Sequence, residues 1–294
     1  MKKRCGYLIE KYRDMGSAYT CRRLLEEAET AGLSLRMIGV EDCLIRPDGV
    51  YFGEEKLEHR DFAILRYKRG HVMEEIRSLC DFSYNSPACF DRYVDKYHQL
   101  KDIEGSGIPY PRYVLCHGAS MPFAVLKEEL GLPFVLKGLA SSMGREIYLI
   151  EDEMGYDAAL RDGACSATGP DKEALAQEFI AHSRGRDLRL YAIRGKVIGA
   201  MIRSSKDDFR SNVALGAEVK GVPITPKMEE IAKKLFICTG YDYVGIDLLF
   251  ASDDPDDLLF CEMNVMAGIQ GMEEATGVNV AGAIIGMIAE DFGI

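Results

Sequence analysis

Three oxygen-bearing side chains stand at fixed places in two apolar segments of the last third of the sequence. Asp247 lies within residues 245–250, and Glu262 and Asn264 lie within residues 258–264. Carboxylate and amide oxygens are ligands that Mg²⁺ prefers, and substrate phosphates usually complete its shell. If Asp247 faces the same way as the other two, the set predicts one or two ions bridging ATP phosphates. Taken singly, each residue is also what the end of an ordinary strand carries.

The two apolar segments are expected to be neighbouring antiparallel strands. Gly245 bounds the first segment, and a turn-forming stretch of Ser, Asp and Pro over residues 252–257 separates the two. Side chains alternate between the faces of a strand, so Glu262 and Asn264, two residues apart, project from one face.

Composition places the chain among soluble globular proteins. It has 294 residues, 47% of them hydrophobic and 28% charged, a length that favours two or three lobes over one core. The formal net charge of −11 argues against an extended nucleic-acid footprint. A local cluster of Arg and Lys could still bind a small anionic substrate.

The cysteines and the N-terminal residues predict a cytoplasmic protein. The nine cysteines are scattered and show no Cys-x-x-Cys pairing, which indicates thiols of a reducing compartment. The first apolar stretch, at residues 7–9, is short enough for a strand and too short for a signal peptide, and no window approaches a membrane span. A homo-oligomer is compatible with these features.

Residues 1–90 are expected to form a small α/β domain. A strand at 5–9, a helix at 19–31 and a strand at 35–40 make a βαβ opening. Pro47-Asp-Gly49 predicts a hairpin turn, and a further strand follows at 62–65.

Residues 91–175 are expected to form a second unit. The pattern predicts helices at 91–104 and 123–130 and strands at 133–138 and 146–150. The loop of small residues at 140–144 leaves backbone N–H groups free to approach phosphate oxygens, although most such loops are simple turns. Lys137, directly before it, favours the phosphate interpretation.

Residues 176–294 are expected to form the third unit. Strands are predicted at 174–180, 187–193 and 196–202, and helices at 226–239 and 280–291. Asp187, Arg189, Arg203 and Arg210 place charges along or just beyond these strands, where a solvated edge is the alternative explanation for any one arginine.

Several motifs in this order resemble one known family. They are Asp95-Lys96, Gly107–Pro109, Phe134–Lys137, Ser141–Gly144, Gln177–Ile180, Asp187–Arg189, Phe209–Asn212, Gly245–Asp247, Glu262–Asn264 and Ala275–Asn279. From about residue 91 onwards, the chain resembles the RimK-type branch of the ATP-grasp carboxylate–amine ligases. The resemblance implies an α/β (α+β) ATP-grasp fold, in which an N-terminal α/β domain precedes two α+β lobes that clamp ATP.

The resemblance also implies roles for individual residues. Asp247, Glu262 and Asn264 match Mg²⁺ ligands, with Mn²⁺ as an alternative ion. Arg210 matches the arginine at the γ-phosphate, and Arg203 is the next candidate. The ATP-binding residues that it implies are Lys96, Lys137, Ser141, Ser142, Met143, Gly144, Gln177, Glu178, Phe179, Ile180, Asp187 and Arg189.

The chemistry implied is formation of an acyl phosphate from a carboxylate and ATP, followed by attack of an amine to give an amide. Phosphoryl transfer needs positioning and charge neutralisation more than a nucleophilic side chain, which agrees with lysines, an arginine and Mg²⁺. The expected partners are an amino acid such as glutamate and a small-molecule, peptide or protein-tail carboxylate. The alternatives are a D-alanine ligase-like or glutathione-synthetase-like enzyme and a nucleotide-binding module without turnover.

Two features bear on the acceptor. Asn264 is followed by Val-Met-Ala-Gly268 where the family commonly has Ala-Ser-Pro-Gly, which leaves the shape of the acceptor pocket open. The expected N-terminal domain also carries basic residues that could hold a carboxylate, although exposed solubilising residues are the simpler explanation for most of them. These are Lys11, Arg13, Arg66, Lys68 and Arg69.

Overall fold

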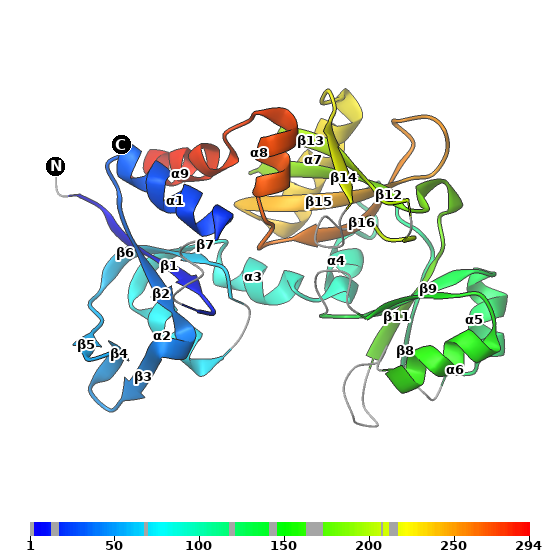
Figure 1. The fold of residues 1–294 in the computed structure, drawn as a ribbon, viewed down its shortest axis with the longest axis horizontal. Helices are drawn as coiled ribbons and strands as arrows, with labels where there is room; N and C mark the ends of the chain where they lie inside the picture. Colours follow the sequence, from blue (N-terminus) through cyan, green and yellow to red (C-terminus); the bar gives the residue numbers. More distant parts are fainter. Residues whose placement is uncertain are drawn as a thin grey trace.

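The computed structural model describes residues 3–12, 18–67, 70–117, 121–140, 146–162, 173–206, 208–211 and 217–294. Within these ranges the chain forms an N-terminal, a central and a C-terminal sheet, together with a small three-stranded sheet. Figure 1 shows the N-terminal and central sheets at opposite ends of the molecule, with helices α3 and α4 between them.

The N-terminal sheet is parallel and has the strand order β2-β1-β6-β7. The expected βαβ opening is confirmed, because α1 connects the parallel strands β1 and β2. The expected hairpin is also confirmed, since Arg46 pairs with Gly49 across the turn between β3 and β4. The elements are β1 Cys5–Glu10, α1 Tyr19–Thr30, β2 Ser34–Gly39, β3 Cys43–Arg46, β4 Gly49–Phe52, β5 Glu55–Lys56, β6 Arg60–Leu65, α2 His71–Ser78 and β7 Cys80–Tyr84.

The single helix expected over residues 91–104 is wrong. Two helices, α3 (Pro87–Tyr93) and α4 (Lys96–Ile103), meet at Asp95. The Asp95 carboxylate accepts hydrogen bonds from the backbone N–H groups of Tyr97 and His98 and so caps a new helix. The break places Lys96 in the first turn of α4.

The central sheet has the strand order β10-β9-β11-β8, with its paired strands antiparallel. The apolar core on this sheet is built around Phe134, Leu136 and Ala176, against α5 and α6. Its elements are β8 Tyr113–His117, α5 Phe123–Leu130, β9 Phe134–Gly138, β10 Ile147–Ile150, α6 Glu153–Asp162 and β11 Glu173–Glu178.

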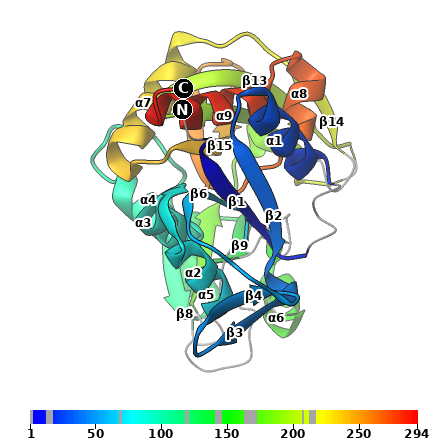
Figure 2. The same ribbon diagram turned by 90° about the vertical axis from the view of Figure 1, so that its left-hand side faces the viewer.

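The C-terminal sheet is antiparallel, with the order β14-β13-β12-β15-β16. One face packs on α7, and α8 contacts β13 and β14. Helix α9 packs on α1 of the N-terminal segment, as Figure 2 shows. The elements are β12 Arg186–Ile193, β13 Lys196–Ser204, β14 Glu218–Gly221, α7 Pro226–Thr239, β15 Tyr243–Phe250, β16 Leu258–Asn264, α8 Gln270–Thr276 and α9 Val280–Asp291.

Asn85 joins the N-terminal sheet to the C-terminal sheet. Its side chain is fully buried directly after β7. Its Oδ1 accepts from the backbone N–H groups of Asp242 (2.6 Å) and Tyr243 (3.2 Å), and its Nδ2 donates to the carbonyls of Tyr243 (2.9 Å) and Val265 (3.4 Å). One amide therefore satisfies backbone groups of two C-terminal segments.

We expect Asn85→Ala to lower the free energy of unfolding by about 2–4 kcal/mol, because buried backbone groups lose their partners. Urea denaturation followed by circular dichroism measures the change. The exposed Gln270→Ala should stay within about 0.5 kcal/mol of the wild type. Equal stability of Asn85→Ala and the wild type would show that Asn85 does not stabilise this junction.

No helix in the described parts of the chain combines the length and apolarity needed to cross a membrane.

Candidate functional site

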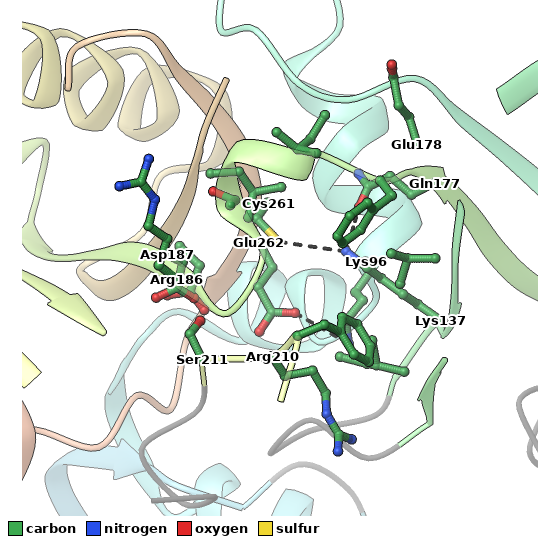
Figure 3. A pocket seen from close by; sticks show the side chains of 18 residues that line it. Lys96, Lys137, Gln177, Glu178, Arg186, Asp187, Arg210, Ser211, Cys261 and Glu262 are labelled. Atoms are coloured by element: carbon green, nitrogen blue, oxygen red, sulfur yellow. Dashed lines mark hydrogen bonds and ion pairs between the residues drawn. The ribbon is translucent and has the colours of Figure 1, made fainter. Parts of the chain in front are cut away.

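A cavity lies between the central sheet and the C-terminal sheet (Figure 3). About 110 Å³ of it can hold the centres of water-sized molecules. The side chains around it come from six strands of the two sheets (β9, β10, β11, β12, β15 and β16), from the start of α4 and from connecting segments. They are Lys96, Val135, Lys137, Ile147, Gln177, Glu178, Phe179, Ile180, Ser183, Arg186, Asp187, Phe209, Arg210, Ser211, Asp247, Leu249, Cys261 and Glu262.

The three expected magnesium ligands meet at one end of this cavity. Strands β15 and β16 pair with Asp247 opposite Glu262, which places both on the same face. Asn264 Nδ2 donates to Glu262 Oε1 at 3.0 Å and to Asp247 Oδ2 at 3.3 Å. Asp247 does therefore face the same way as the other two.

A β-bulge gives β16 its geometry at this point. Leu248 pairs with Phe260 and Asp247 with Glu262, so Cys261 is an extra residue without a partner on β15. The bulge reverses the alternation: Phe260 packs in the core, whereas Cys261 and Glu262 both line the cavity. Bulges are common where a strand must re-aim a functional side chain.

Two arginines surround the Asp247 carboxylate. Arg189 donates to both of its oxygens, with the Nη2–Oδ2 bond at 2.7 Å, and Arg203 Nη2 lies 3.0 Å from Oδ1. Burial would raise the pKa of Asp247, but the two guanidiniums outweigh it and hold that pKa below its ordinary value. Asp247 is therefore an ionised, preoriented carboxylate.

Arg203 also binds both oxygens of Asp187, with its Nε 2.7 Å from Oδ1. Burial raises the pKa of Asp187, and the attraction of Arg203 opposes this rise. Two arginines and two aspartates thus form one buried network. The sequence gives no sign of this pairing, because it arises from cross-strand neighbours on β12, β13 and β15.

The residues fit a hard divalent ion by donor type. Asp247 and Glu262 supply two carboxylates, and the Glu262 side chain is 24% exposed towards the cavity. Asn264 would supply its amide oxygen only after turning its Nδ2 away from these carboxylates. Among the described residues, no cluster of three or more His, Cys, Asp or Glu side chains has a metal-binding arrangement. The Asp247 oxygens are shared with Arg189 and Arg203, so an ion would compete with these contacts.

Both expected phosphate-binding lysines line the cavity. Lys96 Nζ lies 3.6 Å from Glu262 Oε2. Lys137 Nζ donates to Gln177 Oε1 at 2.5 Å and to Cys261 Sγ at 3.7 Å. Burial raises the pKa of the Cys261 thiol to about 11, so it stays protonated at neutral pH. Two buried ammonium groups therefore converge on the acidic end of the cavity.

The expected adenine-reading segment, Gln177–Ile180, forms the end of β11 and the residues after it, along the cavity wall. Gln177 is 1% exposed, and its Nε2 has no hydrogen-bond partner among the described residues. The Glu178 carboxylate instead pairs with Arg112 at 3.0 Å, which lowers its pKa.

Arg210 lines the cavity next to Ser211, and its guanidinium pairs with Asp208 at 2.7 Å. In Figure 3 this guanidinium lies away from the Glu262 carboxylate. Arg203, the alternative phosphate-binding arginine, is 5% exposed and occupied by Asp187 and Asp247.

The remaining expected residues divide into two groups. Arg189 contacts Asp247 and does not line the described part of the cavity. The loop residues Ser141, Ser142, Met143 and Gly144 lie outside the described residues. Several residues of the cavity wall had no expected role of their own. Val135 and Phe209 lie within motifs that carry the family resemblance, whereas Ser183 and Leu249 have no comparable signal.

Solved structures share this architecture. A D-alanine–D-alanine ligase from Bacillus anthracis, complexed with ATP, is 14% identical, with 99% of this chain and 97% of that chain covered and a TM-score of 0.71. The ATP-grasp ligase PsnB, complexed with a minimal precursor, is 17% identical, with 99% and 100% covered and a TM-score of 0.70. At these identities the likeness shows the fold, which is the ATP-grasp fold that the sequence predicted.

Sequence relatives give the family. The model of the RimK-like ATP-grasp domain matches residues 94–288. A probable alpha-L-glutamate ligase of Serratia proteamaculans (strain 568) is 28% identical over 286 residues, which are 94% of this chain and 93% of that protein. A ribosomal protein bS6–L-glutamate ligase of Salmonella schwarzengrund (strain CVM19633) is 28% identical over 281 residues, 92% and 91% of the two chains.

The chain therefore belongs to the RimK-like ATP-grasp family. It is an ATP-dependent carboxylate–amine ligase that forms carbon–nitrogen bonds, and ATP and Mg²⁺ are the cofactors of this class.

Proposed function

We propose that this ligase adds an amino acid such as glutamate to a carboxylate acceptor, which is a small molecule or a peptide or protein tail. The observation that carries the proposal is the convergence of Lys96, Lys137, Asp247 and Glu262 on one cavity between two sheets, with Asn264 donating to both carboxylates. The names of the relatives, alpha-L-glutamate ligase and ribosomal protein bS6–L-glutamate ligase, support glutamate as the added amino acid.

We propose a division of labour among three segments. Residues 91–175 and 176–294 form the two lobes that clamp ATP, and residues 1–90 form a preceding domain. Within the clamp, Lys96 and Lys137 bind phosphate oxygens, and Gln177–Ile180 holds the adenine. Ser141–Gly144 covers the phosphates, and Asp187 lies beside the adenosine.

In the reaction, an acceptor carboxylate oxygen attacks the γ-phosphorus, and ADP leaves. The amine nitrogen then attacks the acyl carbon, phosphate leaves, and the amine loses a proton as the amide forms. Asp247, Glu262 and Asn264 would hold one or two Mg²⁺ ions, with Mn²⁺ as an alternative, and the ions would neutralise phosphate charge. Arg210 would stabilise the transferring phosphoryl group.

An ADP-release screen of amino acids against candidate carboxylates, with mass spectrometry of the products, tests this function. We expect ADP release that requires both substrates and a product heavier by one amino-acid residue. Products containing D-alanine joined to D-alanine, or glycine joined to a γ-glutamyl dipeptide, would place the enzyme in another acceptor class.

A further inference from the structure

Arg66 does not fit the simple explanation for the basic residues of the N-terminal segment. Lys11 is an exposed, solubilising residue as expected, because its side chain is 41% exposed and pairs with Glu41 at the surface. The Arg66 side chain is only 11% exposed. Arg13, Lys68 and Arg69 lie outside the described residues. A buried guanidinium needs partners of its own.

Arg66 lies where parallel sheets bind ligands. It directly follows β6, and its Nε is 3.4 Å from Oε2 of Glu10, the last residue of β1. The carboxyl ends of parallel strands are the usual edge for a ligand in such a sheet. Its Nη1 donates to the Ala267 carbonyl at 3.4 Å, so Arg66 also touches the segment after β16.

The surroundings of Arg66 contain buried hydrogen-bond donors without acceptors. The hydroxyls of Tyr191 and Tyr243 have no hydrogen-bond partner among the described residues, and Arg66 Nε makes only the 3.4 Å ion pair with Glu10 Oε2 there. Each tyrosine is 1% exposed, and both feel the Arg66 charge. Burial raises the pKa of both phenols, so they remain O–H donors. Unpaired buried donors are costly, and an acceptor bound here would remove that cost.

Tyr191 and Tyr243 lie on the same face of the C-terminal sheet as Asp247. On β15, Tyr243, Gly245 and Asp247 alternate onto one face, and on β12 Tyr191 pairs with Gly245. A Cβ on Gly245 would lie 2.7 Å from the Ala267 Cβ and 3.0 Å from Arg189 Nη1. The glycine therefore lets the side chains of Ala267 and Arg189 pack closely against β15 between Tyr243 and Asp247.

We propose that Arg66, Tyr191 and Tyr243 form a subsite for a carboxylate of one of the two substrates. This proposal rests on the proposed ligase function and assigns part of its substrate recognition to the N-terminal segment. Glu10 partly neutralises Arg66, but a guanidinium has five N–H donors, so Glu10 and the Ala267 carbonyl leave others for a ligand. The carboxylate belongs either to the amino acid or to the acceptor.

Removing one tyrosine hydroxyl at a time tests whether these residues bind a substrate or only stabilise the fold. Tyr191→Phe and Tyr243→Phe keep the ring and should each raise the KM of the substrate concerned by on the order of 10-fold. Neither should lower Tm without substrate, because the hydroxyls have no partner to lose. Tyr241→Phe is the matched control: its hydroxyl donates to the Ala232 carbonyl at 3.0 Å, so this variant should lower Tm and leave both KM values unchanged.

Arg66→Met should raise the same KM by on the order of 10²-fold, and Arg66→Lys should rescue part of it. The Kd for a non-hydrolysable ATP analogue should stay unchanged. Arg77→Met, at a surface pair with Asp91, is the control for loss of an arginine. KM is measured by varying the concentration of L-glutamate at a fixed concentration of acceptor, and then the reverse. The substrate whose KM rises is the one whose carboxylate binds here.

A binding measurement distinguishes failure of this subsite from failure of the proposed function. L-glutamate, or a peptide ending in glutamate, is added with the ATP analogue, and Tm is recorded. Stabilisation of the wild type but not of Arg66→Met supports the subsite even if no substrate pair releases ADP. Equal stabilisation of both proteins, no stabilisation of either, or tyrosine variants that lower Tm while leaving every KM unchanged would each overturn the subsite.

Discussion

If Glu262 holds Mg²⁺ as proposed, Glu262→Gln should lower ADP release by at least about 10²-fold, because the variant replaces a charged ligand of the ion that would neutralise the phosphates. The Glu262 side chain is partly exposed and its ion pair with Lys96 is long at 3.6 Å, so the fold should survive. Turnover is measured as ADP release over a Mg²⁺ titration, and Tm reports folding. Glu218→Gln, at a surface carboxylate paired with Lys206, is the matched control.

Asp247→Asn should abolish turnover as well, but this variant is also expected to lose stability, so a loss of turnover would not by itself indicate a lost metal ligand. Asp247 neutralises Arg189 and Arg203, and removing one partner of a buried ion pair typically costs about 3–5 kcal/mol of stability. Glu262→Gln is therefore the sharper test. Wild-type turnover in a folded Glu262→Gln variant would remove the metal assignment.

Arg210→Ala should lower kcat by on the order of 10²-fold or more while the Kd for ATP changes much less. Charge redistributes at the γ-phosphate as the acyl phosphate forms, so a guanidinium there matters more to the transition state than to bound ATP. Arg210→Lys should restore only part of the loss, since an ammonium cannot make the planar two-pronged contact. Single-turnover ADP formation and a direct ATP-binding measurement provide the two readouts.

The structure makes the competing assignment testable. Arg210 must leave its contact with Asp208 to reach phosphate, so Asp208→Asn is expected to leave kcat near the wild-type value. Wild-type kcat in Arg210→Ala would transfer the role to Arg203. An Arg203 variant needs a parallel Tm measurement, because Arg203 neutralises two buried aspartates.

Much of the fold could be predicted from periodicity and turn residues. The helices at 123–130, 226–239 and 280–291 occur as expected, because each has an apolar stripe and a clear boundary, such as Thr225-Pro226 or Asn279. The break at Asp95 was hidden, since one aspartate within a helical pattern is compatible with a continuous helix. Strands β8 and β14 are short and lie at sheet edges, where alternation is weak.

The site could be predicted in part. Alternation alone placed Glu262 and Asn264 together, and opposite pairing of β15 and β16 adds Asp247. The partners of Asp247 could not be predicted, because Arg189 and Arg203 reach it across strands that are distant in sequence. The burial of Arg66 could not be predicted for the same reason: a lone arginine after a strand is usually solvated, and this one is buried against Ala267 and two tyrosines of another sheet.

Because of the bulge at Cys261, β16 should tolerate the deletion of one residue, a change that would reverse the side-chain directions in an ordinary strand. Deleting one residue from a strand normally turns everything beyond it to the opposite face. Without Cys261, Phe260 would be followed directly by Glu262, and the ladder would continue from Leu248–Phe260 to Asp247–Glu262 without interruption. Cys261 is thus an inserted residue, and Phe260 and Glu262 would point to the same faces of the sheet with or without it. The effects expected of such a bulge are local: it bends its strand, and here it sets a thiol beside Lys137 in the wall of the cavity.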